Sequence, residues 1–149
     1  MSQTYFGSAL RSGSGTLTDT VDGGFVVLAQ TSTVTTNADG TASSTSVTIP
    51  SGSQIINIFI DQTQNETVGG GTATAINATV GTAAAGTQYV SATDVIGGGR
   101  AALTFTAAQL AAMADVGANT GVYLTVDPNG TIATTQGIYR LTVVYAQKG

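Results

Sequence analysis

Turn-forming residues divide the chain from residue 25 onward into short segments, and this spacing limits the possible folds more than any other feature. The segments are rich in β-branched and aromatic residues and have the length of strands. The clearest turn signals are Asn37-Ala38-Asp39-Gly40, Pro50-Ser51-Gly52-Ser53, Gly97-Gly98-Gly99 and Asp127-Pro128-Asn129-Gly130. About seven to nine short strands result, which is typical of an all-β antiparallel sandwich or jelly roll. A parallel sheet would need a long crossover between each pair of strands.

The strongest strand candidates are residues 54–61 and 138–147. In the first, Ile56, Ile58 and Ile60 alternate with residues of the opposite face, and the second alternates over its whole length. We expect the core to be built on the largest apolar residues at such positions: Ile56, Ile58, Ile60, Phe105, Leu141 and Val143.

One segment departs from the strand pattern. Residues 106–117 are rich in alanine, Thr106 and Gln109 have the spacing of a capping box, and Gly117 suits a C-terminal stop. The pattern predicts a short helix, with three residues facing the sheet: Leu110, Met113 and Ala114.

The first 24 residues are organised differently from the rest. They hold few large apolar side chains and the flexible run Ser12-Gly13-Ser14-Gly15, which is too little for an independent core. Two interpretations stay open, a disordered tail or an extended arm that becomes ordered on a partner. The sequence thus predicts an arm at 1–24 and a single β-sandwich domain at 25–149.

Missing residue types exclude many functions. The chain has no His and no Cys, which removes imidazole catalysis, disulfides and metal sites that need those ligands. Four basic residues cannot neutralise a nucleic-acid backbone, no apolar run is long enough to span a membrane, and the N-terminus lacks a signal-peptide pattern. We expect no catalytic residue, no metal and no cofactor.

Some residues have an alternative chemical interpretation. Asp61 with Glu66, and Asp94 with Asp115, are the only candidate acid–base pairs, and solvated carboxylates at strand ends are the simpler explanation. Four tyrosines could stack on sugars, but their alternating strand positions favour the edge of the core: Tyr89, Tyr123, Tyr139 and Tyr145.

The scarcity of charge is the most informative feature for function. Exposed sheet edges are normally guarded by Lys or other charges, and only 8% of residues here are charged. Such edges would pair with other strands unless the arm, a sister subunit or a larger assembly covered them. We therefore expect a structural protein that works as a homo-oligomer.

Residues 45–149 resemble small β-rich virion proteins of tailed bacteriophages in order and composition. The similarity runs from Ile-Pro-Ser-Gly-Ser-Gln-Ile at 49–55, through 99–110, to the last strand at 143–147. These proteins include capsid decoration, or cement, proteins. The resemblance implies a protein made in the host cytoplasm that binds the major capsid protein on the outer surface of the virion. It also favours a trimer over a dimer, because threefold positions recur on icosahedral shells. A tail or head-fibre component is the alternative, followed by a carbohydrate-binding module or an enzyme.

The candidate partner-binding residues are apolar anchors in the arm and the arginines: Tyr5, Phe6, Leu10, Arg11 and Arg100. An arm of this kind can add a strand to a neighbouring sheet edge, where main-chain hydrogen bonds supply affinity.

Deleting residues 2–20 should lower the occupancy of the protein on its particle without lowering its melting temperature, because an arm of this composition contributes no core. Occupancy and melting temperature, measured on the same preparation, check this. Unchanged occupancy would mean that the contact surface lies on the sandwich.

Overall fold

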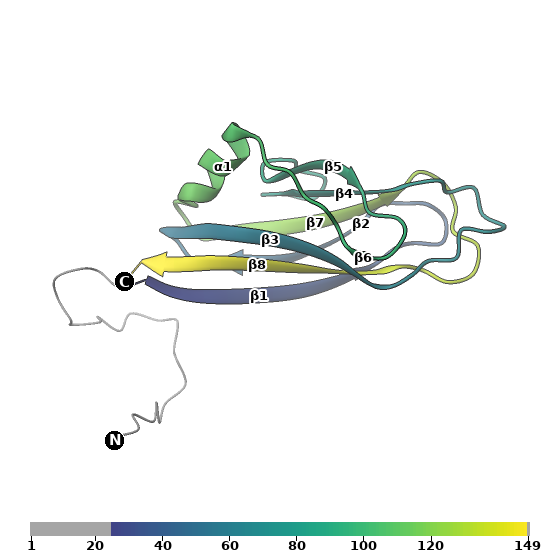
Figure 1. Ribbon diagram of the computed structural model, residues 1–149, viewed down its shortest axis with the longest axis horizontal. Helices are drawn as coiled ribbons and strands as arrows, with labels where there is room; N and C mark the ends of the chain where they lie inside the picture. The colour runs from purple at the N-terminus through teal and green to yellow at the C-terminus, as the bar shows by residue number, and fades with distance from the viewer. Residues whose placement is uncertain (1–24, 149) are drawn as a thin grey trace, which may run out of the picture.

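The computed structural model describes residues 25–148, so the expected arm at 1–24 lies outside the described residues. The chain forms eight strands and one helix (Figure 1). Their bounds are β1 (Phe25–Thr35), β2 (Ser43–Ile49), β3 (Ser53–Gln64), β4 (Ile76–Gly81), β5 (Val90–Asp94), β6 (Gly99–Arg100), α1 (Ala107–Ala114), β7 (Thr120–Pro128) and β8 (Ile138–Lys148).

The strands form two four-stranded antiparallel sheets that pack face to face. We call them sheet A, in the order β1-β8-β3-β6, and sheet B, in the order β2-β7-β4-β5. The first strand pairs with the eighth, the second with the seventh, the third with the sixth and the fourth with the fifth. This is the pairing of a jelly roll, so the predicted fold class is confirmed.

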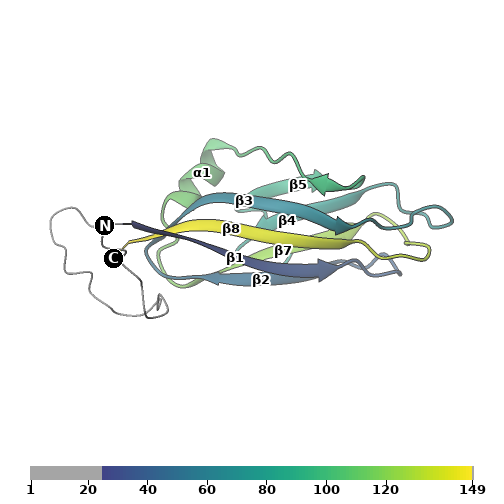
Figure 2. The ribbon, with the colours of Figure 1, turned by 60° about the horizontal axis from the view of Figure 1, so that its bottom comes forward.

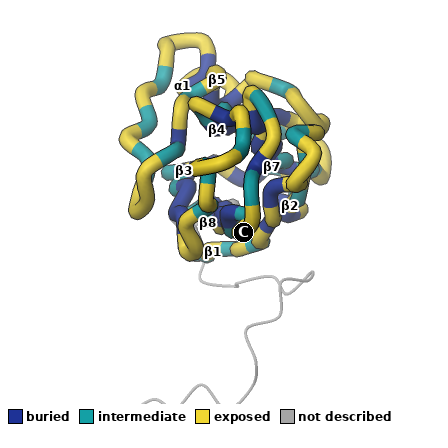
Figure 3. Tube along the Cα trace, turned by 90° about the vertical axis from the view of Figure 1, so that its right-hand side faces the viewer, coloured by how far each residue is buried: buried dark blue, intermediate teal, exposed yellow. Residues whose placement is uncertain are grey.

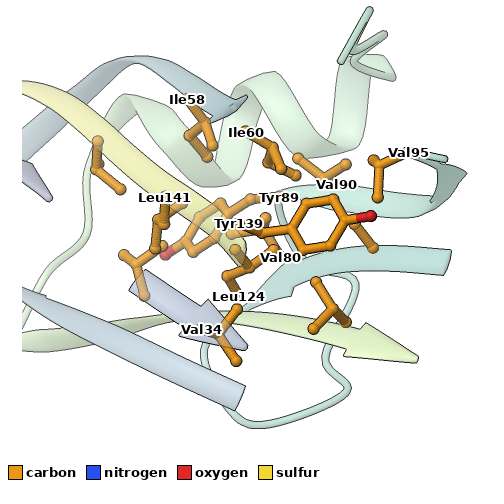
Figure 4. Close-up of a cluster of buried hydrophobic side chains, with 14 of the residues drawn as sticks. Val34, Ile58, Ile60, Val80, Tyr89, Val90, Val95, Leu124, Tyr139 and Leu141 are labelled. Atoms are coloured by element: carbon orange, nitrogen blue, oxygen red, sulfur yellow. The ribbon is translucent and has the colours of Figure 1, made fainter. Parts of the chain in front are cut away.

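Side chains that alternate into the space between the sheets make the core (Figure 4). Four of the six predicted core residues are fully buried there, namely Ile58, Ile60, Leu141 and Val143. Phe105 is only partly buried and packs against the core, as do Ala101 and Leu103, which follow the two-residue strand β6. Viewed from the end of the sandwich that carries the loops between β3 and β4 and between β7 and β8, buried segments lie inside a shell of exposed ones (Figure 3).

The prediction that Ile56 belongs to the core is wrong, because a β-bulge changes the phase of β3. The register with β8 shifts between Ile55 and Asn57. Ile55 is therefore buried before the bulge and Ile58 after it, while the side chain of Ile56 is 49% exposed. A bulge places two residues opposite one on the partner strand, so strict alternation fails across it.

The predicted helix forms, but it presents a different face to the sheets. Its capping box is present: the Gln109 backbone N–H donates to Thr106 Oγ1 (3.3 Å), and the Thr106 N–H donates to Gln109 Oε1 (2.9 Å). Gln109 and Met113 are buried, whereas Leu110 is 53% exposed and Ala114 is exposed, so those two assignments are wrong. The polar residue faces inward because its amide also donates to Thr87 O (3.2 Å) and Ser91 Oγ (3.1 Å).

The lateral edges of the sandwich carry almost no charge, and other parts of the chain cover some of their length. Along β1 and β2, Gln30 Nε2 donates to Thr48 O (2.8 Å), Ser43 Oγ donates to Thr35 O (2.7 Å), and the hydroxyls of Ser32 and Thr45 are hydrogen-bonded. On the opposite side, α1 packs against β3 and reaches β5 through Gln109. These contacts occupy edge groups that would otherwise be open to strand pairing.

Three loops pack tightly at the end of the sandwich opposite α1. The loop between β3 and β4 pairs with the loop between β7 and β8, with Thr67 N donating to Thr135 O (2.8 Å). Ile132 N donates to Ala38 O (3.0 Å) in the turn between β1 and β2. A Cβ at Gly71 would overlap the carbonyl oxygen of Thr131, so the absence of a side chain allows the close approach.

Ile58→Ala should destabilise the fold by about 2–5 kcal/mol, because it removes fully buried methyl groups. Ile56→Ala is the matched control and should cost less than about 1 kcal/mol, because its side chain is half exposed. Denaturant unfolding of both variants checks the bulge. Equal losses would contradict the phase change in β3.

Gly71→Ala should destabilise the protein by about 1–3 kcal/mol, because the new methyl group forces two loop backbones apart. Gly69→Ala, two residues earlier, meets no atom within 4 Å and should be close to neutral. Thermal unfolding of the two variants separates close packing from a general need for flexible glycines.

Candidate interaction surface

Sheet A presents an outer face that the rest of the described chain leaves open. Figure 2 shows β3, β8 and β1 side by side, with none of the described loops crossing their middle. Since alternate residues of β8 point into the core, the intervening ones point outward, and the register aligns them with β1 and β3. The outward side chains, here called the A face, are Val27, Ala29, Thr31, Thr33, Gln54, Asn57, Phe59, Asp61, Arg100, Arg140, Thr142, Val144 and Ala146, of which Ala146 is buried.

One row of the A face carries charge. The register places Arg100, Asp61 and Arg140 side by side on β6, β3 and β8. Arg100 Nε donates to Asp61 Oδ1 (2.8 Å), and Arg140 Nη2 donates to Asp61 Oδ2 (3.2 Å). The Arg100 guanidinium also lies 4.3 Å from the centre of the Phe59 ring, a cation–π contact.

This arrangement stabilises the Asp61 carboxylate. Hydrogen bonds from Arg100 in particular, together with those from Arg140, hold the pKa of Asp61 below its usual value, against the opposing effect of burial. The Asp61 side chain is 13% exposed, while those of Arg100 and Arg140 are 58% and 46% exposed. Two guanidinium groups and one carboxylate make the row net positive on a chain whose net charge is −4.

The other half of the A face is small and mostly apolar. Val27 is 59% exposed, and Ala29 and Val144 are paired across β1 and β8. Ile56 is exposed nearby at the bulge of β3. Val27 and Ile56 are two of the three large hydrophobic residues that the described chain exposes. This half, here called the apolar patch, also holds the polar Gln54 and Asn57, and the row of Thr31, Thr142 and Phe59 separates it from the arginine row.

The outer face of sheet B is partly covered. The loop between β4 and β5 folds back toward it, so that Ala85 N donates to Thr125 Oγ1 (2.7 Å). Ala85 adopts a φ of +58°, which is uncommon for a residue with a side chain and indicates that this contact constrains the loop. The two faces of the sandwich therefore differ, and the A face is the open one.

Of the predicted partner-binding residues, Arg100 belongs to the A face. Tyr5, Phe6, Leu10 and Arg11 lie outside the described residues. Sequence reasoning missed Asp61, Arg140 and Phe59 as its neighbours. The sequence signal for Asp61 and Arg140 was the presence of a charged residue in each of the two most apolar strands.

The alternative chemical interpretations find little support. Tyr89, Tyr139 and Tyr145 are buried, as the core interpretation predicted, and only Tyr123 points outward, on sheet B. Burial and the neighbouring Glu66 raise the pKa of Tyr139, whose hydroxyl donates to Glu66 Oε2 (3.0 Å). The first candidate pair is not a pair in the structure: Asp61 binds Arg100 and Arg140, and Glu66 accepts from Gln62 and Tyr139.

The other candidate pair is also engaged elsewhere. Asp94 accepts from the backbone N–H groups of Ile76 and Ile96, and Asp115 accepts from Gly117 N. Within residues 25–148, no group of three or more acidic, His or Cys side chains is placed to hold a metal ion. None of the helices in that range is long and apolar enough to cross a membrane.

No family model matches the chain, and searches of curated proteins and of solved structures found no match either. The geometry of the A face is therefore the basis for assigning a function.

Asp61→Asn should lower the free energy of unfolding by about 1 kcal/mol at pH 7, a modest loss because both arginines are about half exposed to solvent. The pKa of Asp61 is lower in the folded than in the unfolded protein. Its ion pairs therefore contribute fully to the free energy of unfolding above the unfolded pKa of about 3.9, and this contribution is lost as the pH falls through the folded pKa. The difference between wild type and variant should be constant above about pH 5 and shrink below about pH 4.

Asp127→Asn, on the outer face of sheet B and contacted by neither described arginine, is the matched control for these unfolding curves. A difference between wild type and Asp61→Asn that persists undiminished at about pH 2 would contradict the ion-pair assignment.

Proposed function

We propose that this chain is a structural protein of a tailed-bacteriophage virion that binds the outer surface of the capsid and stabilises it, as decoration proteins do. The observation that carries the proposal is the open A face. It combines an exposed apolar patch with a fixed pair of arginines on a sandwich whose edges are partly covered. A surface of that kind suits association with another protein.

The use of polar side chains supports a role without catalysis. Some buried polar groups in the described chain hold elements together: Gln109 joins α1 to β5, and the hydroxyl of Thr36 accepts from Gly137 N (2.9 Å). Asp61, the most strongly engaged carboxylate, is neutralised by two arginines. The jelly roll itself serves many functions, so the fold alone does not select this one.

The proposal includes self-association. A decoration protein at a threefold position of the shell would be a homotrimer, and we favour a trimer over a dimer on that ground. The partly covered edges at β1 and β2 favour contacts through faces or through the segment before β1 over pairing of those edges.

The copy number in purified particles tests the proposal. Quantitative mass spectrometry of the particle encoded by the same genome should give a copy number comparable to that of the major capsid protein. Removal of the gene should leave capsids that rupture at lower temperature. A few copies per particle would instead indicate a tail or head-fibre component. Absence from the particle would overturn the virion assignment, and binding of the isolated protein to a glycan array would then favour a carbohydrate-binding module.

A further inference from the structure

The described chain offers few surfaces on which a partner could dock. The edges of β1 and β2 are joined through side chains, α1 covers the side between β3 and β5, and the loop between β4 and β5 lies against sheet B. At the end of the sandwich opposite α1, the loops form backbone hydrogen bonds with one another. Exposed positions such as Ser46 and Thr48 remain on the outer face of sheet B, but the A face is the more open of the two sheet faces.

We propose that the A face is the surface that contacts the capsid, and that it fits a partner surface with carboxylates opposite the arginine row and small apolar side chains opposite the apolar patch. This inference rests on the proposed function and specifies its contact surface. Both described arginines lie on this face, whereas Asp39, Glu66, Asp94, Asp115 and Asp127 lie on loops or on β5 and β7. Charge is thus segregated, and the A face is the net positive side of an acidic protein.

The arginine row is prepared for binding before a partner arrives. Both guanidinium groups donate hydrogen bonds to Asp61, and that of Arg100 also stacks on the Phe59 ring. Arg140 donates to Asp61 through one of its nitrogens, and a guanidinium has five N–H donors, so donors remain for a second carboxylate. Groups already held in place lose less conformational entropy on binding.

The position of β1 is compatible with a contact at this face. Residues 1–24 join the described chain at Phe25, the first residue of the edge strand of sheet A. A segment of that length can span up to about 80 Å when extended. A partner in contact with the A face is therefore within reach of the predicted anchors Tyr5, Phe6 and Leu10.

Matched charge reversals test the inference. Thr31→Glu with Thr33→Glu adds two carboxylates to the A face on β1. Ser46→Glu with Thr48→Glu adds the same two charges to exposed positions of β2, the edge strand of sheet B. Each full-length protein is titrated onto capsids purified from a strain that lacks the gene, and bound protein is quantified. Circular dichroism and the unfolding midpoint establish that both variants fold.

We expect the Thr31/Thr33 variant to bind at least about tenfold more weakly than wild type, because like charges meet across the interface. The Ser46/Thr48 variant should bind within about twofold of wild type, and Arg140→Gln should be intermediate.

Other outcomes separate this inference from the proposed function. Wild-type binding that both double variants retain, or that both lose equally, would overturn the A face as the contact surface while leaving the decoration role in place. Failure of the wild-type protein to bind these capsids would overturn the decoration role itself. Conversion of an oligomer to a monomer by the Thr31/Thr33 changes, with capsid binding retained, would assign the A face to self-association and overturn the inference.

Discussion

The antiparallel pairing of β8 with both β1 and β3 is the interaction on which the rest of the structure depends. The eleven residues of β8 lie between β1 and β3, and each has a defined partner on β1. Because side chains alternate along a strand, this one register places Tyr139, Leu141, Val143 and Tyr145 in the core and Arg140, Thr142 and Val144 on the A face. The core and the candidate surface are therefore two sides of the same pairing, and a slip of one residue would exchange them.

The bulge in β3 lets one almost wholly apolar segment supply residues to the core and also place Asp61 on the outer face. Before it, Ile55 faces the core, and after it Ile58 and Ile60 do so. The phase change leaves Ile56 exposed and turns Phe59 and Asp61 outward, where Asp61 meets both arginines. Without the bulge, the carboxylate would be on the opposite face from Arg140. The same irregularity thus exposes an isoleucine and assembles the charged row.

Protection of the sheet edges takes an unusual form in this chain. Serine, threonine and glutamine side chains bridge β1 and β2 where charged residues often guard an edge. These residues cap free carbonyl groups of the edge strands without adding charge. On sequence grounds, the scarcity of charge implied that the sheet edges need cover from the arm, a sister subunit or a larger assembly. Along β1 and β2, hydrogen bonds within the described chain supply part of that cover. The open A face, rather than an open edge, is consequently the argument for a partner.

Local patterns in the sequence were sufficient to predict the all-β class, the short helix with its capping box, most turns and four core residues, because alternation and turn chemistry act over a few residues. Local patterns could not place Ile56, because a bulge depends on the register with β8. They also could not predict the inward face of the helix, because Gln109 is buried by its hydrogen bonds to Thr87 and Ser91. The charged row joins Asp61 to Arg100, 39 positions away, and to Arg140, 79 positions away. Only the pairing of distant strands brings those charges together, because register is decided by the whole sheet.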